Sequence, residues 1–121
     1  MMSHILNTQR MRYNTITADT NSNVDLWALH SIENLKNKNA ALTELYIKLI
    51  TRLKLSELNE KIETKTLDGD IFFMTITDIL IHIANHGSHH RGQVSLRLRE
   101  LGIAPPNYGY IYYAKSFPDF W

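Results

Sequence analysis

The stretch that decides both the fold and the site lies late in the chain and reads His86-Gly87-Ser88-His89-His90-Arg91-Gly92-Gln93. An apolar stripe with helical spacing runs from Ile76 to Leu101, and His86 and His90 stand in the middle of it, where leucines would be expected. Side chains four residues apart project side by side from a helix, which is the spacing that lets two imidazoles bind one metal ion. An unpaired buried polar group costs about 1 to 3 kcal/mol, and a shared metal would remove that cost for both rings.

A second interpretation treats these rings as core histidines paired with neighbouring carbonyls or hydroxyls. Clustering favours the metal, because four of the six histidines, His82, His86, His89 and His90, lie within nine residues. Successive steps of four turn only about 40° around a helix, so these rings share one broad face. His82 with His86 has the same spacing as His86 with His90, and spacing alone does not choose the ligand pair.

A resemblance to a known family indicates which histidines are the ligands. The run from Asp78 to Pro106 closely resembles the last core helix of the DinB superfamily of metal-dependent hydrolases and thiol transferases, which is unrelated to the polymerase of the same name. The resemblance extends from about Ser3 to Tyr113, and it rests on His86-x-x-x-His90-Arg91-Gly92-Gln93, Leu98-Arg99 and Gly102-Ile103-Ala104-Pro105-Pro106, together with Ser3-His4-Ile5-Leu6-Asn7 and Gln9-Arg10-Met11 near the start. It implies that His86, His90 and His4 are the three metal ligands.

The resemblance also implies a fold, which is a mainly all-α, four-helix up-down-down-up bundle. Family members usually begin with another helix before the one that carries the first histidine, whereas this chain starts almost at His4, so we expect a bundle that lacks its first helix. The family tends to place an aspartate three positions after the Pro-Pro pair, where this chain has Gly109. Residues 1–121 are expected to form one helical metal-binding domain.

The segments of the chain fit this fold. A short helix is predicted over residues 3–17, a polar loop over residues 19–23, and a second helix that ends near Leu53 and that Ser31 can cap. Near-alternating β-branched residues around Asp68-Gly69 predict a small β-hairpin with a tight turn. The last core helix is expected from Thr75, with Asp78 as its capping-box partner, to Gly102.

Composition narrows the class of protein. The chain has 121 residues, 44% of them hydrophobic, and a net charge of +1 that gives no general attraction to nucleic acid. No stretch approaches the roughly 18 apolar residues of a membrane span, and no signal peptide is evident, so we expect a cytoplasmic protein. Cysteine is absent, so any metal is held by nitrogen or oxygen, and a thiol in the reaction would arrive with the substrate.

Three neutral imidazoles would leave a metal with open positions for water or substrate, which is typical of catalytic sites. Zinc is the first expectation, with nickel, manganese or iron as alternatives, and the reaction would be hydrolysis or thiol transfer on a small molecule, with a low-molecular-weight thiol as one candidate. No Asp or Glu occurs from Ile79 to Arg99, so the base of His-Glu-x-x-His proteases is absent. Proton transfer would fall to metal-bound hydroxide, to His82 or His89, or to a residue elsewhere, and no catalytic residue is assigned.

Two other hypotheses remain at this point. One is a chain that binds metal without catalysis and acts by association, and the other is a structural bundle with unliganded histidines. Gln93 is expected to steady a ligand or a loop by a hydrogen bond, Arg91 to orient an anion or remain solvated, and His30 to be dispensable for metal binding.

The C-terminal tail carries seven of the twelve aromatic residues in its last fourteen positions. Such a tail is expected either to pack along its own bundle or to help cover an open groove, and a homodimer is the favoured expectation. The seven residues are Tyr108, Tyr110, Tyr112, Tyr113, Phe117, Phe120 and Trp121.

Overall fold

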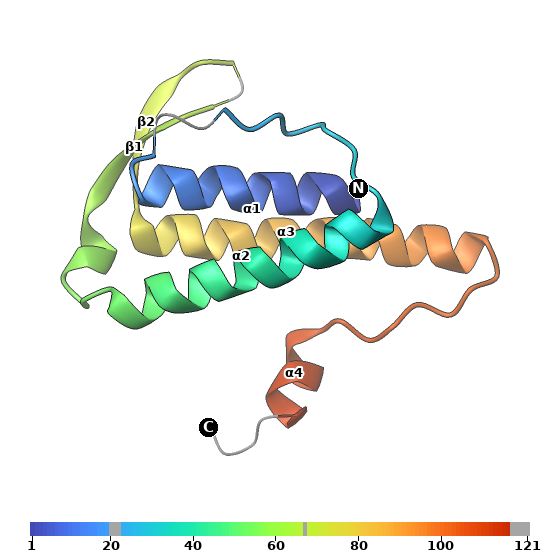
Figure 1. Ribbon diagram of the computed structural model, residues 1–121. Coiled ribbons are helices and arrows are strands. Elements are labelled where there is room, and N and C mark those ends of the chain that lie inside the picture. Colours follow the sequence, from blue (N-terminus) through green and yellow to red (C-terminus); the bar gives the residue numbers. More distant parts are fainter. Residues whose placement is uncertain (20–22, 67, 117–121) are drawn as a thin grey trace.

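The structure, a computed structural model, describes residues 1–19, 23–66 and 68–116. Three long helices run roughly side by side, and a two-stranded hairpin stands at one end of them (Figure 1). In chain order the described elements are α1 (Met2–Ile16), α2 (Ile32–Arg52), a 3₁₀ turn η1 (Glu57–Asn59), β1 (Lys61–Lys65), β2 (Ile71–Thr75), α3 (Ile76–Glu100) and α4 (Tyr110–Ser116).

Helix ends follow the capping signals of the sequence. The Ser31 side chain accepts a hydrogen bond from the Asn34 backbone N–H at 3.2 Å, which begins α2. Thr75 and Asp78 form the predicted capping box at the start of α3, each side chain accepting from the other's backbone N–H. Gly102 takes a positive φ of 77° just after α3, a conformation that glycine adopts without strain.

The predicted hairpin is present before α3, with Asp68-Gly69 in its turn. β1 and β2 pair antiparallel, with Lys61 opposite Thr75 and Lys65 opposite Ile71, so residues 66–70 form the connection. The Thr66 backbone N–H donates to the Asp70 carbonyl at 2.9 Å, which closes the loop outside the Asp-Gly pair. Gly69 supplies the positive φ, at 90°. The Gly69 backbone N–H also donates to the Thr66 carbonyl at 3.0 Å, so the predicted tight turn at Asp68-Gly69 is present.

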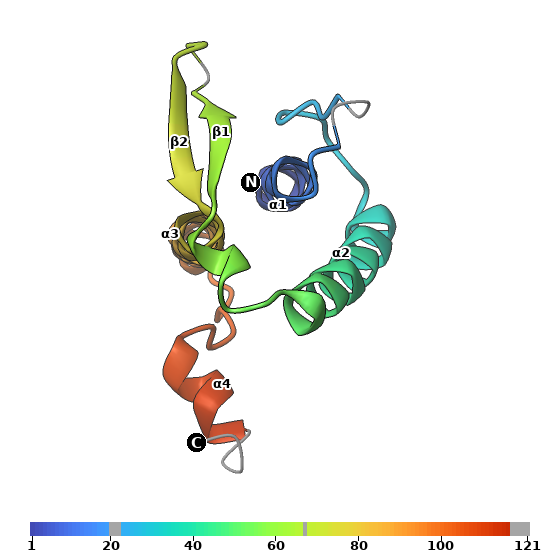
Figure 2. The ribbon, with the colours of Figure 1, turned by 90° about the vertical axis from the view of Figure 1, so that its left-hand side faces the viewer.

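Helix α1 lies between α2 and α3 and packs against both (Figure 2). Its two neighbouring residues Ile5 and Leu6 are both buried. The core that α1 organises is small, and its buried hydrophobic side chains are Ile5, Leu6, Leu42, Leu49, Ile76 and Ile79. The fold is thus mainly helical with a small antiparallel hairpin, as the sequence predicted.

Helix α4 lies apart from the three long helices in both ribbon views (Figures 1 and 2). The sequence marked this tail as aromatic but did not predict a helix there. Its side chains stay largely exposed, with Tyr110 at 65% and Ile111 at 73% of full exposure. Phe117, Phe120 and Trp121 of the predicted aromatic tail lie outside the described residues.

Across the part of the chain that the structure describes, no helix is both long enough and apolar enough to cross a lipid bilayer.

Candidate metal centre

Three imidazoles meet where the first turn of α1 faces the middle of α3. His4 comes from α1, and His86 and His90 stand one turn apart on α3. One nitrogen of each ring lies within 4.8 Å of the corresponding nitrogens of the other two. Among the described residues, these three form the group of potential metal ligands, which we call the histidine triad. They are the same three residues that the family resemblance selected.

Hydrogen bonds on the outer sides of two rings fix which nitrogen faces the centre. His90 Nδ1 lies 2.7 Å from Gln93 Oε1, and His4 Nδ1 lies 3.1 Å from the Leu26 carbonyl oxygen. Both oxygens can only accept, so each Nδ1 carries the proton and donates it. The Nε2 atoms of neutral His4 and His90 therefore keep their lone pairs, which is the form that a metal requires.

His86 is held in the neutral state by its surroundings. Burial, followed by the unfavourable approach of a second positive charge on His90 or His4, lowers its pKa to about 4. Near neutral pH, protons therefore do not compete with a metal for this ring.

The spacing of the two rings on α3 suits a shared metal. His86 Nε2 and His90 Nε2 are 3.2 Å apart. Two ligands at about 2.0 to 2.1 Å from a tetrahedral zinc ion would have their nitrogens about 3.3 to 3.4 Å apart. The residues present thus fit a zinc ion without rearrangement of α3.

Asn7 of α1 holds the segment between α1 and α2 in place beside the triad. Its buried amide donates to the carbonyl oxygens of Leu26, at 3.3 Å, and Ala28, at 2.8 Å. Its oxygen accepts from His30 Nε2 at 2.8 Å. The Leu26 carbonyl also accepts the hydrogen bond from His4 Nδ1. Asn7 therefore holds in place the acceptor that sets the His4 tautomer. Asn7 is part of the family pattern, but the sequence indicated no role for it.

Trp27 forms one wall of the site and was missed by the sequence analysis. Its ring stacks on His4, with ring centroids 4.3 Å apart and planes within 5° of parallel. The side chain remains 68% exposed, and its backbone N–H is held by Asp25 Oδ1 at 2.9 Å. A lone tryptophan in a polar loop carries no spacing signal that links it to a histidine one helix earlier.

The remaining histidines lie outside the triad. The His82 ring packs against His86 with centroids 5.6 Å apart, and burial followed by the nearby charge of Arg12 lowers its pKa. His89 is exposed, and its Nε2 lies 3.4 Å from the Gln93 amide nitrogen. Gln93 thus bridges His90 and His89, in agreement with the steadying role expected for it.

Arg91 and the two glycines of α3 are explained by local contacts. The Arg91 guanidinium donates to Ser88 Oγ at 3.3 Å. A Cβ atom on Gly87 would stand 2.7 Å from Arg91 Nη1, and one on Gly92 would stand 3.2 Å from the Tyr108 hydroxyl. Within the protein, the close neighbours of these glycines are therefore side chains.

The sequence matches a known protein family over most of its length. Residues 2–118 match the DinB family, and the chain belongs to that family. Among curated proteins, it is similar to Protein DinB of Bacillus subtilis (strain 168), with 31% identity over 88 residues. The match covers 70% of this chain and 50% of that relative, so the chain spans about half the length of the curated relative.

Proposed function

We propose that the histidine triad binds a divalent metal ion, with zinc as the first candidate, and that the protein is a metal-dependent enzyme acting on a small molecule. The observation that carries the proposal is the convergence of His4, His86 and His90, with two of their tautomers set by Leu26 and Gln93. A chance meeting of three rings would not require outer acceptors that leave Nε2 free.

The proposed reaction is hydrolysis or transfer of a thiol. A metal held by three neutral imidazoles supplies Lewis-acid chemistry at its open coordination positions. The chain's own residues bind and orient the substrate beside this metal. Trp27 stacks on His4 and offers an exposed aromatic face to the substrate. His89, exposed and joined to His90 through Gln93, is the proposed proton acceptor, because α3 has no carboxylate between Ile79 and Arg99.

Metal analysis tests the first half of the proposal. Protein purified without a histidine tag and equilibrated with zinc is expected to retain one zinc ion per chain. His4→Ala, His86→Ala and His90→Ala should each lose tight binding, whereas the exposed His89→Ala is the matched control and should retain it. Equal metal content in the wild type and in His86→Ala would contradict the proposal.

Turnover tests the second half. Hydrolysis of a nitrophenyl ester and transfer of a low-molecular-weight thiol to chlorodinitrobenzene distinguish the two reactions, the latter forming a carbon–sulfur bond as chloride leaves and the thiol proton passes to a base. Activity that requires zinc and is lost in His90→Ala supports the enzyme. Zinc binding without turnover in either assay favours the alternative, a metal-binding family member that acts by association.

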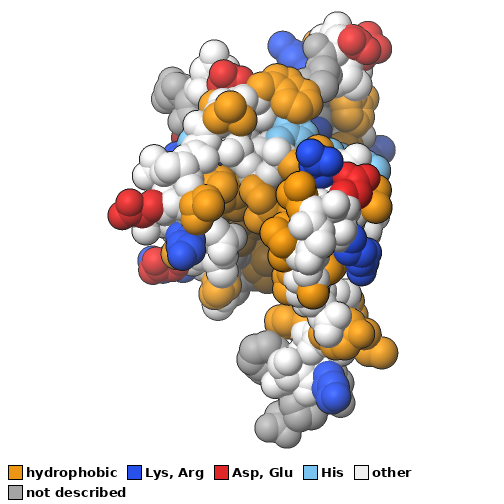
Figure 3. Space-filling view, turned by 90° about the vertical axis from the view of Figure 1, so that its right-hand side faces the viewer, with side chains coloured by type: hydrophobic (Ala, Val, Ile, Leu, Met, Phe, Trp, Pro, Cys, Tyr) orange, Lys and Arg blue, Asp and Glu red, His pale blue; other side chains and the backbone are white. Residues whose placement is uncertain are grey.

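We also propose that the protein is a homodimer. A groove of about 390 Å³ runs between α1 and α2 and reaches Arg91 of α3, and Figure 3 shows hydrophobic side chains gathered in a hollow on this face. The apolar side chains of α4 are also exposed, so the same chain carries an open apolar groove and an apolar helix set apart from its own bundle. A second copy would cover both. The groove is lined by Met2, Ile5, Leu6, Gln9, Ile32, Leu35, Lys36, Asn39 and Arg91.

Light scattering at micromolar concentration tests the dimer. We expect twice the chain mass of 14.1 kDa, and a shift toward that mass itself when Ile111→Asp places a charge on α4. A wild-type mass of 14.1 kDa would exclude the dimer and leave the metal proposal intact.

A further inference from the structure

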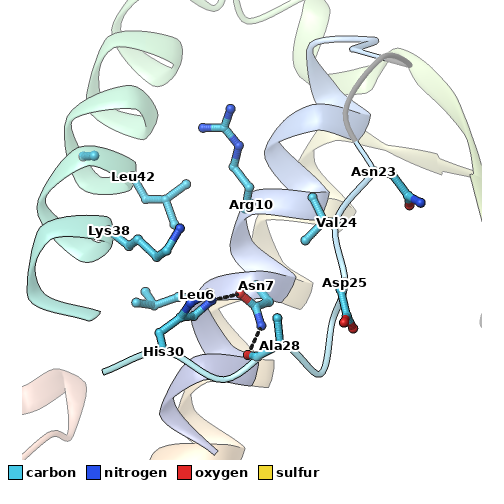
Figure 4. A pocket seen from close by; sticks show the side chains of 11 residues that line it. Leu6, Asn7, Arg10, Asn23, Val24, Asp25, Ala28, His30, Lys38 and Leu42 are labelled. Atoms are coloured by element: carbon cyan, nitrogen blue, oxygen red, sulfur yellow. Dashed lines mark hydrogen bonds between the residues drawn. The ribbon is translucent and has the colours of Figure 1, made fainter. Parts of the chain in front are cut away.

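A second cavity also lies on the α2 side of α1, between α1, α2 and the segment that joins them (Figure 4). Its volume is about 470 Å³, within the range of about 300 to 1,000 Å³ that is usual for small-molecule sites. None of the residues that line it belongs to the histidine triad. They are Leu6, Asn7, Arg10, Asn23, Val24, Asp25, Ala28, His30, Lys38, Ala41 and Leu42.

Two cations from different helices face this cavity. Arg10 projects from α1 and Lys38 from α2, and both side chains extend into the space between the helices (Figure 4). Within the described residues neither forms an ion pair, and the guanidinium of Arg10 lies 5.8 Å from the Tyr13 ring centre. Like charges that share a cavity repel each other, so the arrangement is more favourable with an anion between them.

The one carboxylate of the lining does not neutralise these cations. Asp25 stands at the rim, and Figure 4 shows its carboxylate directed away from Arg10 and Lys38. Its Oδ1 is already engaged by the Trp27 backbone N–H. The cavity therefore has a net positive lining.

The floor of the cavity is rigid and partly apolar. Asn7 is buried, and its hydrogen bonds to Ala28 and His30 hold the connecting segment against α1 (Figure 4). Leu6 and Leu42 are buried beside it and offer carbon surface. Such a site pairs charged groups for one end of a ligand with apolar contact for the rest.

We propose that this cavity binds a small organic anion, whose carboxylate or phosphate group is held between Arg10 and Lys38. The planar guanidinium of Arg10 suits two parallel hydrogen bonds to either group, while Lys38 adds a point charge. The carbon part of the ligand contacts Leu6, Val24 and Leu42. The site is separate from the metal centre and does not depend on the proposed function.

Titration calorimetry with inorganic phosphate and with succinate, at constant ionic strength, tests the proposal on the full chain. Binding with a dissociation constant of about 1 mM is expected for such small probes. Phosphate alone, succinate alone or both identify the anion class, and each supports the site. Lys38→Gln and Arg10→Gln should each weaken binding about tenfold, the effect of losing one charge-assisted hydrogen bond.

Two controls make the test specific. Lys48→Gln removes another exposed lysine of α2, one that pairs with Glu44 at 3.0 Å, and should leave anion binding unchanged. His90→Ala should also leave anion binding unchanged, because His90 does not line the cavity. An anion bound instead to a metal in the triad would be lost in that variant. The proposal is overturned if neither probe binds, if Lys48→Gln weakens binding as much as Lys38→Gln does, or if His90→Ala abolishes it.

Discussion

The two sides of α1 are built differently. Toward α3, the helix meets the buried Ile76 and Ile79, and the histidine triad sits in the same seam. Toward α2, two leucines are buried, but Ile32 of α2 lines the open groove and remains 74% exposed, and a cavity stays open as well. Metal ligands must be held in place to within a fraction of an ångström, and the closely packed seam provides that, whereas the looser side provides surface for binding.

The largest expected effect contrasts the packing of these two sides. Ile79→Ala should lower the free energy of unfolding by about 2 to 5 kcal/mol, because Ile79 is fully buried and the substitution leaves a cavity. Ile47→Ala, on the exposed face of α2, should change it by less than about 0.5 kcal/mol. Urea denaturation measures both variants. Similar losses would show that Ile47 is packed as closely as Ile79 in solution.

Zinc bound to the triad should raise the free energy of unfolding of the protein. A ligand that binds only the folded protein, at a concentration about 100 times its dissociation constant, raises the free energy of unfolding by about 2.7 kcal/mol. Thermal unfolding with and without zinc measures the gain, and a chelator should reverse it. The same gain in the triple variant His4→Ala/His86→Ala/His90→Ala would place the metal elsewhere.

A smaller effect is expected from the outer hydrogen bond of the triad. Gln93→Ala leaves all three ligands in place but removes the acceptor for His90 Nδ1, so zinc affinity should fall about 10- to 100-fold. Gln9→Ala on α1, beside the groove, is the matched control and should leave zinc affinity unchanged. Competition with a chelating dye measures both. An unchanged affinity in Gln93→Ala would mean that His90 orients without its partner.

The smallest effect concerns acid stability of the metal-free protein. The folded pKa of His86 is lowered to about 4 from 6.5, so the unfolded state binds more protons in this interval. Stability from this group is complete above about pH 6.5 and is lost as the pH falls toward 4. His86→Asn should therefore lose less stability than wild type over that interval in urea titrations. Parallel curves would show that the ring is not buried in its neutral form.

Features that depend on residues close together in the chain could be predicted from the sequence. The Thr75–Asp78 capping box, the Ser31 cap and the hairpin depend on contacts within a few positions, and each is present. The pairing of His86 with His90 follows from helical spacing. His4 was placed by family resemblance, since no local pattern connects it with histidines more than eighty residues away.

The parts of the site that escaped prediction depend on where an irregular segment lies. Trp27 and the Leu26 carbonyl contact His4 from a segment that Asn7 helps to hold against α1. Polar loop residues have no periodicity to reveal which face they contact. The seven-residue helix α4 was missed because aromatic residues at nearly alternate positions, Tyr108, Tyr110 and Tyr112, resemble no helical stripe.

The most direct test of the metal centre is anomalous diffraction at the zinc edge from zinc-replete crystals. We expect one strong peak about 2.0 to 2.2 Å from the Nε2 atoms of His4, His86 and His90. A peak bounded by His82 and His86 instead, or no peak near α3, would contradict it.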